Sequence, residues 1–392
     1  MAKKIDHSKR AHAKLSPSGS QRWINCPPSA NLEEASGIKD STSPFAAEGT
    51  EAHELSEIRL VEALRIPKNT EKAFENFKKK AKFYSEEMEE EVEKYVEIAM
   101  SIYREALKED SHARAYVEQK LDLTKFVPNG FGRGDFLVVG DGILDVVDLK
   151  YGKGIRVSAI ENSQLRLYGL GAYELLSFLY DIHTVRIHII QPRLDNFSTE
   201  ILLVEDLLSW GSTTVLPAAK KAEAGQGQLK PGDHCRWCKV APICKANAEA
   251  NLEVAKFDFK DPRLLSDVEL LKIYSVLPTV LQWASAVSKY VFDRALEGKD
   301  WPGYKLVEGR SQRKFKDEES AVVELELEGY LHDEIFNKKI KGLAELKKLL
   351  GASLFSEIIA PYLIKPKGNP TLVKESDKRP GLGIEQAKID FK

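Results

Sequence analysis

Apolar residues recur every three or four positions in the first part of the chain, which is the spacing of amphipathic helices. A helix is expected from Glu48 to Leu64, and Pro67 ends it because proline cannot continue a helix. From Glu71 to Leu107 the same spacing predicts one long helix or two stacked ones, with the apolar stripe packed in a core. The stripe consists of Phe74, Phe77, Ala81, Tyr84, Met88, Val92, Tyr95, Ala99, Ile102 and Ala106.

Strict alternation of apolar and polar residues begins at Ala115 and predicts strands. Residues 158–180 return to helical spacing, and the segments 185–195 and 197–205 predict a further strand pair. This order is typical of an α/β or α+β core, so we expect a mixed sheet flanked by helices, with a helical N-terminal segment and a mainly helical C-terminal region. The predicted parts are 1–115 (a cysteine strap and helices), 116–255 (the core and a Cys-rich closing turn) and 256–392 (an accessory domain).

Composition narrows the class of protein. The chain has 392 residues, which suggests two or three domains, and its formal net charge of −2 excludes a histone-like polycation. No apolar run approaches the ~18 residues that span a bilayer, which on this argument excludes a transmembrane protein. The basic opening lacks the apolar stretch of a secretory signal, so a cytoplasmic location is expected.

The segment from Asp135 to Lys150 carries the most informative chemistry. Asp141-Gly142 lies between two apolar runs and predicts a type I′ hairpin turn. Closing the hairpin there places Asp135 directly opposite Asp148, where two like charges repel. Mg²⁺ would remove that repulsion, since it is commonly held by one or two carboxylates and substrate phosphate. Lys150 shares the face of Asp148 because side chains alternate along a strand.

Two acids, a metal and an ammonium group suit phosphodiester hydrolysis. The metal polarises the phosphate and lowers the pKa of a water, while the lysine orients that water or stabilises developing negative charge. The alternative is a solvated polar hairpin, because the DxK pattern alone is unspecific. Glu118 on the preceding strand and the helix after the hairpin favour the functional interpretation.

With these motifs, residues 10–250 resemble the PD-(D/E)xK nuclease superfamily, in particular its RecB-like branch. The matching motifs are GTEAH with His53, VEQK with Glu118, GRGD with Asp135, DLK with Asp148 and Lys150, and QLRLY with Gln164 and Tyr168. The resemblance implies a restriction-endonuclease-like core and a Mg²⁺- or Mn²⁺-dependent deoxyribonuclease. It also implies that His53, Asp135, Asp148 and the backbone carbonyl of Leu149 bind the metal, with Gln164 and Tyr168 in supporting or DNA-positioning roles.

Each of these residues also has an ordinary structural interpretation. A lone histidine on a helix, such as His53, is more often a core or surface residue than a ligand. Gln164 and Tyr168 lie four residues apart on one helix face and could pack against the sheet. Glu118 could form an exposed pair with Lys120.

The four cysteines form a second candidate site. Cys235, Cys238 and Cys244 have the spacing C-x2-C-x5-C, and Cys26 stands alone far from them in sequence. Compact cysteine turns usually bind metal, and a Cys₄ site would need Cys26 to join the other three. Zinc and a 4Fe–4S cluster are both possible, as is a zinc site of three cysteines and His234 with Cys26 free. The spacing resembles that of AddB-type nucleases and the CRISPR-associated adaptation nuclease, which implies an iron–sulfur staple.

The C-terminal third offers composition rather than a motif. Trp301, Tyr304 and Lys305 precede Arg310, Arg313 and Lys314, a mixture of aromatic and basic residues suited to DNA binding, although a solvated face is the alternative. The whole chain resembles an uncharacterised family of phage-encoded RecB-like nucleases. We therefore expect an exonuclease acting in recombination or repair, with DNA and a recombination protein as partners. The rival hypothesis is a catalytically inactive nuclease fold that binds DNA or protein.

Overall fold

The structure, a computed structural model, describes residues 13–38, 44–253, 267–305, 317–329, 331–336, 342–359 and 362–363. These residues belong to two units, 1–306 and 307–392. The three-part division expected from the sequence stays a prediction.

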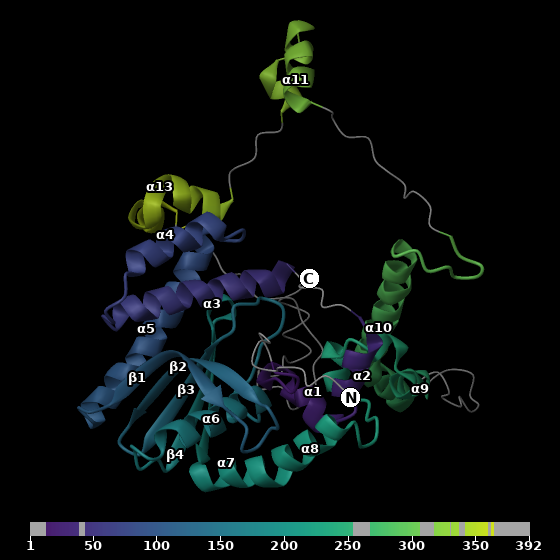
Figure 1. The fold of residues 1–392 in the computed structure, drawn as a ribbon. Coiled ribbons are helices and arrows are strands. Elements are labelled where there is room, and N and C mark those ends of the chain that lie inside the picture. Colours follow the sequence, from purple (N-terminus) through teal and green to yellow (C-terminus); the bar gives the residue numbers. More distant parts are fainter. Residues whose placement is uncertain are drawn as a thin grey trace. The chain divides into compact units, whose positions relative to one another are not determined.

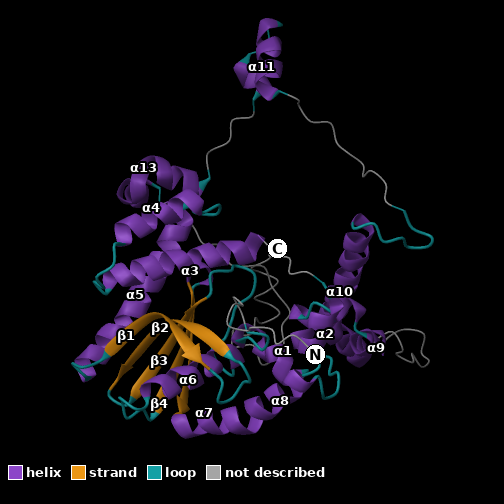
Figure 2. Cartoon of the chain, in the orientation of Figure 1, coloured by secondary structure: helices purple, strands orange, loops and turns teal. Residues whose placement is uncertain are grey.

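A five-stranded mixed sheet forms the centre of the first unit (Figure 2). Its strand order is β1-β2-β3-β4-β5; β3 and β4 are parallel and the other neighbours are antiparallel. The parallel pair requires a crossover, which the helix α6 (Ser163–Leu176) supplies. The strands are β1 (Arg114–Asp122), β2 (Phe131–Gly140), β3 (Ile143–Leu149), β4 (Thr184–Gln191) and β5 (Asn196–Leu203). The mixed α+β class expected from the sequence is confirmed.

Each face of the sheet packs against its own set of helices (Figure 1). Alternate residues of β2 point to opposite faces, as the strand period of two requires. Phe136 and Val138 join a core with α3 (Pro44–Ala63), α4 (Thr70–Lys80) and α5 (Glu86–Glu109). Leu137 and Val139 join the core that α6 covers on the other side. The sheet is therefore buried on both faces.

The apolar stripe from Glu71 to Leu107 forms two helices rather than one, which was one of the two expectations. Polar caps explain the break, because they satisfy backbone N–H groups at a helix start. The side chain of Asn69 accepts a hydrogen bond from Lys72 N at the start of α4, and that of Ser85 accepts one from Met88 N at the start of α5.

Segments from the two ends of the first unit lie side by side. The N-terminal elements are η2 (Pro17–Gly19), α1 (Ser20–Asn25) and α2 (Ser29–Ser36), and both α1 and α2 contact α8 (Leu216–Ala224). Trp23 is fully buried, and Lys239 N donates a hydrogen bond to Glu33 Oε1 at 2.7 Å. The remaining elements between β4 and residue 253 are η3 (Pro192–Leu194), α7 (Val204–Trp210), η4 (Gly211–Val215), η5 (Asp233–Trp237), η6 (Ala241–Ile243) and α9 (Lys245–Glu253).

The helix α10 (Asp267–Leu296) is a candidate membrane span, which the sequence argument from apolar runs had excluded. Its 30 residues are long and apolar enough to cross a membrane, with none of its most apolar window buried. Length and composition therefore do not exclude a membrane span, contrary to the expectation from apolar runs. The helix contains Pro278.

The second unit contributes three short helices among its described residues, α11 (Glu318–Leu327), α12 (His332–Ile335) and α13 (Leu343–Ile358). The basic residues Arg310, Arg313 and Lys314 lie outside the described residues. The prediction of a DNA-binding strip there stays a prediction.

Candidate metal-dependent active site

The hairpin between β2 and β3 has the predicted turn and register. Asp141 and Gly142 both have positive φ, 45° and 74°, as a type I′ turn requires. The ladder runs from Gly140 paired with Ile143 to Phe136 paired with Val147. The next position in this register places Asp135 across from Asp148. A hydrogen bond from Leu149 N to Asp135 Oδ2, 3.0 Å long, holds this carboxylate at the end of the ladder.

Glu118 extends this pair to a row of three carboxylates on adjacent strands. In the β1–β2 ladder Val117 pairs with Phe136 and Gln119 with Gly134, so Glu118 faces Asp135. Glu118 has a φ of 51°, in the left-handed region that costs a non-glycine residue free energy. The backbone pairing between β1 and β2 is interrupted at Glu118, since Val117 and Gln119 have partners on β2 and Glu118 has none in that ladder. Strain of this kind is frequent at functional sites, and here it occurs beside two other acids.

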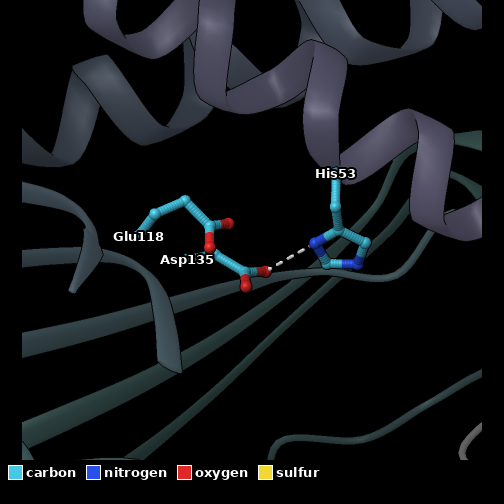
Figure 3. A group of neighbouring side chains, drawn as sticks. All are labelled: His53, Glu118 and Asp135. Carbon is cyan, nitrogen blue, oxygen red and sulfur yellow. Dashed lines mark ion pairs between the residues drawn. The ribbon is translucent and has the colours of Figure 1, made fainter. Parts of the chain in front are cut away.

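The helix α3 places His53 over this row (Figure 3). His53 Nδ1 lies 3.2 Å from Asp135 Oδ2. One ligand atom each from His53, Glu118 and Asp135 lie within 4.8 Å of one another. Burial lowers the pKa of His53, but the charge of Asp135 and the hydrogen bond to it outweigh burial and raise the pKa to about 9. A proton on His53 thus balances part of the negative charge.

The three carboxyl groups respond differently to their crowding. Burial would raise the pKa of Asp135, but His53 and the Leu149 N–H hold it below its usual value. The pKa of Asp148 is raised by burial and by the charge of Asp135, against the opposing effect of Lys150. Burial and Asp135 raise the pKa of Glu118 to about 7. Each of these carboxylates makes it harder for its neighbours to ionise, so a cation bound between them would be stabilising.

A chain of polar contacts leads from Asp148 to α6. Lys150 Nζ lies 2.7 Å from Asp148 Oδ2 and donates a 3.2 Å hydrogen bond to Gln164 Oε1. Gln164 Nε2 in turn donates to the Tyr168 hydroxyl at 3.1 Å. Asp148 Oδ2 is fully buried, and despite its ion pair it accepts no hydrogen bond of good geometry within the described part of the chain. The structure thus brings together all the residues that the sequence proposed for this site.

Tyr95 is a polar residue of this region, and its place in the apolar stripe predicts only core packing. It is fully buried on α5, and its hydroxyl finds no hydrogen-bond partner among the described residues. Burial and the charges of Asp135, Asp148 and Glu118 raise its pKa well above the usual value. Buried tyrosine hydroxyls normally have a partner. A tyrosine inside an apolar helical stripe is the one signal in the sequence that could have drawn attention to it.

The four cysteines converge on a single cavity far from the carboxylates in sequence. Cys26 at the end of α1 lines this cavity together with Cys235, Cys238 and Cys244. His234 lines it too, but its Nε2 already lies 2.8 Å from the carbonyl oxygen of Lys230. All four cysteines are described, and no three of their sulfurs lie within 4.8 Å of one another. Burial raises the pKa of Cys238 to about 12.

The chain belongs to a family described as "Protein of unknown function (DUF2800)", whose match covers residues 12–380. Among solved structures, it is similar to one titled "Crystal structure of SSO0001", with 13% sequence identity. That match covers 58% of this chain and 96% of the other, with a TM-score of 0.22. Neither comparison assigns an activity.

Proposed function

We propose that this protein is a metal-dependent deoxyribonuclease of the RecB-like type. The observation that carries the proposal is the row of Glu118, Asp135 and Asp148 on three adjacent strands, with His53 above it and Lys150 beside it. A buried surplus of carboxylates needs a cation, and phosphodiester hydrolysis needs one too.

The residues present fit a divalent cation such as Mg²⁺ or Mn²⁺. Carboxylates are the ligands these ions prefer, and Mn²⁺ also accepts imidazole. Ligands on opposite sides of Mg²⁺ lie about 4.2 Å apart, close to the 4.8 Å limit that His53, Glu118 and Asp135 satisfy. The incompletely bonded Asp148 Oδ2 offers a further oxygen. His53, Asp135, Asp148 and the Leu149 carbonyl would hold the ion, with His53 giving up its proton when the ion binds, and Glu118 supplies an additional carboxylate.

Such an ion would polarise the phosphate and lower the pKa of the attacking water. The chain itself supplies the remaining functions. Lys150 places a positive charge beside Asp148, where it stabilises negative charge that develops on the phosphate. Gln164 fixes the position of Lys150, and Tyr168 fixes Gln164 from the next turn of α6. Gln164 and Tyr168 are positioning residues in this scheme.

We propose DNA as the substrate and an exonuclease in recombination or repair, of phage type, as the class. The support is the likeness of the sequence motifs to the RecB-like branch. A recombination protein as partner and a cytoplasmic location belong to the same proposal. α10 has the composition of a possible span, so the location needs its own test by fractionation.

We propose that the cysteine site cross-links the N-terminal segment at Cys26 to the segment Cys235–Cys244, which follows the sheet in sequence. Its four thiols suit a 4Fe–4S cluster, with zinc as the alternative. Sulfurs around tetrahedral zinc lie about 3.8 Å apart, whereas no three of the four thiols come within 4.8 Å. The cavity between them is about 20 Å³, which is room for about one water, so the cysteine side chains would have to move apart to admit a cluster. Protein purified without oxygen is expected to be brown with about four irons per chain. A metal analysis that finds one zinc and no iron would show that the cross-link is a zinc site and not an iron–sulfur cluster.

A cleavage assay tests the nuclease proposal. Single- and double-stranded DNA are incubated with the protein in Mn²⁺, Mg²⁺ or a chelator, and products are expected only with the metals. Asp148→Asn should lower cleavage about 10³-fold, whereas Asp141→Asn should leave it unchanged. The control makes the same substitution in the same hairpin, and Asn-Gly keeps the type I′ turn. DNA binding without hydrolysis under every metal condition would support the inactive binding module instead.

A further inference from the structure

A groove of about 1170 Å³ is lined by residues of β1, β2 and α6, the elements that also carry residues of the candidate active site. The adjoining ends of β1 and β2 form one wall and the helix α6 another, while Ser16, Pro17 and Ser18 close one side. Gly132 lines the groove, and an added Cβ there would come within 2.8 Å of the Tyr168 ring. The tyrosine ring therefore packs directly on the strand.

Two residues connect the groove to the candidate active site. Tyr168 lines the groove, and its hydroxyl accepts the hydrogen bond from Gln164, which contacts Lys150. Arg133 also lines it, is largely exposed, and its Nη1 lies 3.5 Å from Glu118 Oε2. None of the three carboxylates lines the groove, so Arg133 and Tyr168 are its links to the candidate active site.

Three cations and two acids line the groove, and Lys120 is the cation that has no acidic partner among the described residues. Lys120, Lys125 and Arg133 line it against Asp122 and Glu174. Lys125 is paired with Glu174 at 2.6 Å. Lys120 makes no ion pair with any described residue, and its ammonium lies 5.9 Å from the centre of the Phe131 ring. Exposed cations interleaved with an aromatic ring match the way proteins hold single-stranded nucleic acid, through phosphate contacts and base stacking.

We propose that this groove binds single-stranded DNA and leads it to the carboxylate row. Lys120 and Lys125 contact phosphates, Phe131 stacks on a base, and Arg133 holds the phosphate next to the reacting one. The proposal rests on the nuclease function for the fate of the strand, but the binding itself does not require hydrolysis.

The size and the aromatic ring of the groove favour this occupant. Its volume exceeds the range of about 300–1,000 Å³ that is usual for small-molecule pockets. A single strand, unlike a duplex, has unpaired bases that are free to stack on Phe131.

The test compares two charge-matched double variants of the full chain. Lys120→Gln/Lys125→Gln removes two positive charges from the groove. Lys220→Gln/Lys221→Gln removes two exposed charges from α8, where neither lysine makes an ion pair with a described residue. Binding of a fluorescein-labelled oligothymidylate of about 16 nucleotides is followed by anisotropy in chelator over a range of salt concentrations.

Loss of two phosphate contacts should weaken binding at least about tenfold and reduce the salt slope of log Kd by about 1.4 in the groove variant alone. In cleavage assays the same variant should raise KM for the single strand and leave kcat unchanged. Phe131→Leu should weaken binding about fivefold or more without changing the salt slope.

The outcomes separate this inference from the nuclease proposal. Specific binding that depends on Lys120 and Lys125 but gives no cleavage in any metal would sustain the groove and overturn the nuclease. Metal-dependent cleavage, together with equal DNA binding by both double variants, would support the nuclease and overturn the groove as the binding site. Tighter binding of a duplex than of the single strand, with the same dependence on Lys120 and Lys125, would overturn single-stranded DNA as the occupant.

Discussion

Two buried carboxylates three residues apart on β3 hold their negative charge in opposite ways. Asp145 accepts hydrogen bonds from Arg186 Nε at 2.6 Å and from Nη2 at 2.8 Å. A third contact, 2.8 Å long, comes from His188 Nε2, whose other ring nitrogen lies 3.0 Å from Thr199 Oγ1. The chain itself supplies all the compensation that this buried charge needs.

Asp148 has a second carboxylate, Asp135, as its neighbour across the ladder, and its own ion pair is with Lys150. Glu118 adds a third acid, and His53 gains a proton to balance the charge. A structural ion pair is complete within the chain, whereas this cluster keeps a surplus of carboxylate oxygens. That surplus is what distinguishes a candidate cation site from an ordinary buried salt bridge.

The largest expected difference between the two carboxylates is in catalysis. Asp148→Asn and, separately, Lys150→Ala should each lower cleavage of DNA about 10³-fold, about 4 kcal/mol in activation free energy, because each removes charge placed for the transition state. Rates are measured with Mn²⁺ at saturating DNA. Retention of near wild-type activity by either variant would show that the chemistry lies elsewhere.

For stability we expect the opposite order, with a larger effect at Asp145 than at Asp148. Asp145→Asn should lower the free energy of unfolding by about 3 kcal/mol, because Arg186 and His188 lose the charge that compensates them. This is the lower end of the range for buried pairs, since the Arg186 side chain is 29% exposed. Urea unfolding without metal measures it. Asp148→Asn in the same assay should change the free energy of unfolding by less than about 1 kcal/mol, because it removes the repulsion between Asp148 and Asp135. Equal losses in the two variants would show that Asp145 and Asp148 do not differ in how their charge is compensated.

The cysteine site gives an intermediate effect. Cys26→Ser should lose the bound metal and lower the free energy of unfolding by about 2 kcal/mol, as loss of a covalent cross-link does. The expected fall in Tm is about 4–8 °C. Wild-type protein stripped by a chelator is the control and should melt at the temperature of the variant. Unchanged metal content and Tm in Cys26→Ser would refute the staple.

The smallest expected effect concerns Tyr95. Removing its unpartnered hydroxyl by Tyr95→Phe should stabilise the metal-free protein by about 1 kcal/mol, because a buried polar group without a partner costs free energy. If the hydroxyl gains a partner when the site is loaded, that advantage should shrink in Mn²⁺. Urea unfolding with and without Mn²⁺ separates the two states, and a destabilised metal-free variant would show that the hydroxyl is already satisfied.

Local patterns predicted much of the candidate site. The Asp141-Gly142 turn and the alternation of β2 and β3 determine where Asp135 and Asp148 lie, because a two-residue turn sets the register of a hairpin. The approach of His53 from α3 and of Gln164 from α6 came from motif likeness alone. Periodicity describes which face of a helix is buried and not which strand it meets.

The sequence by itself determined the elements and the hairpin, since both depend on side-chain periodicity and on turn chemistry between near neighbours. It could not determine the left-handed backbone of Glu118, the isolation of the Tyr95 hydroxyl or the complete pairing of Asp145. Each of these depends on what packs against the residue from a distant part of the chain. Asp145 and Asp148 look alike in sequence, and only the tertiary structure decided that Arg186 and His188 would meet the first while Asp135 and Lys150 would flank the second.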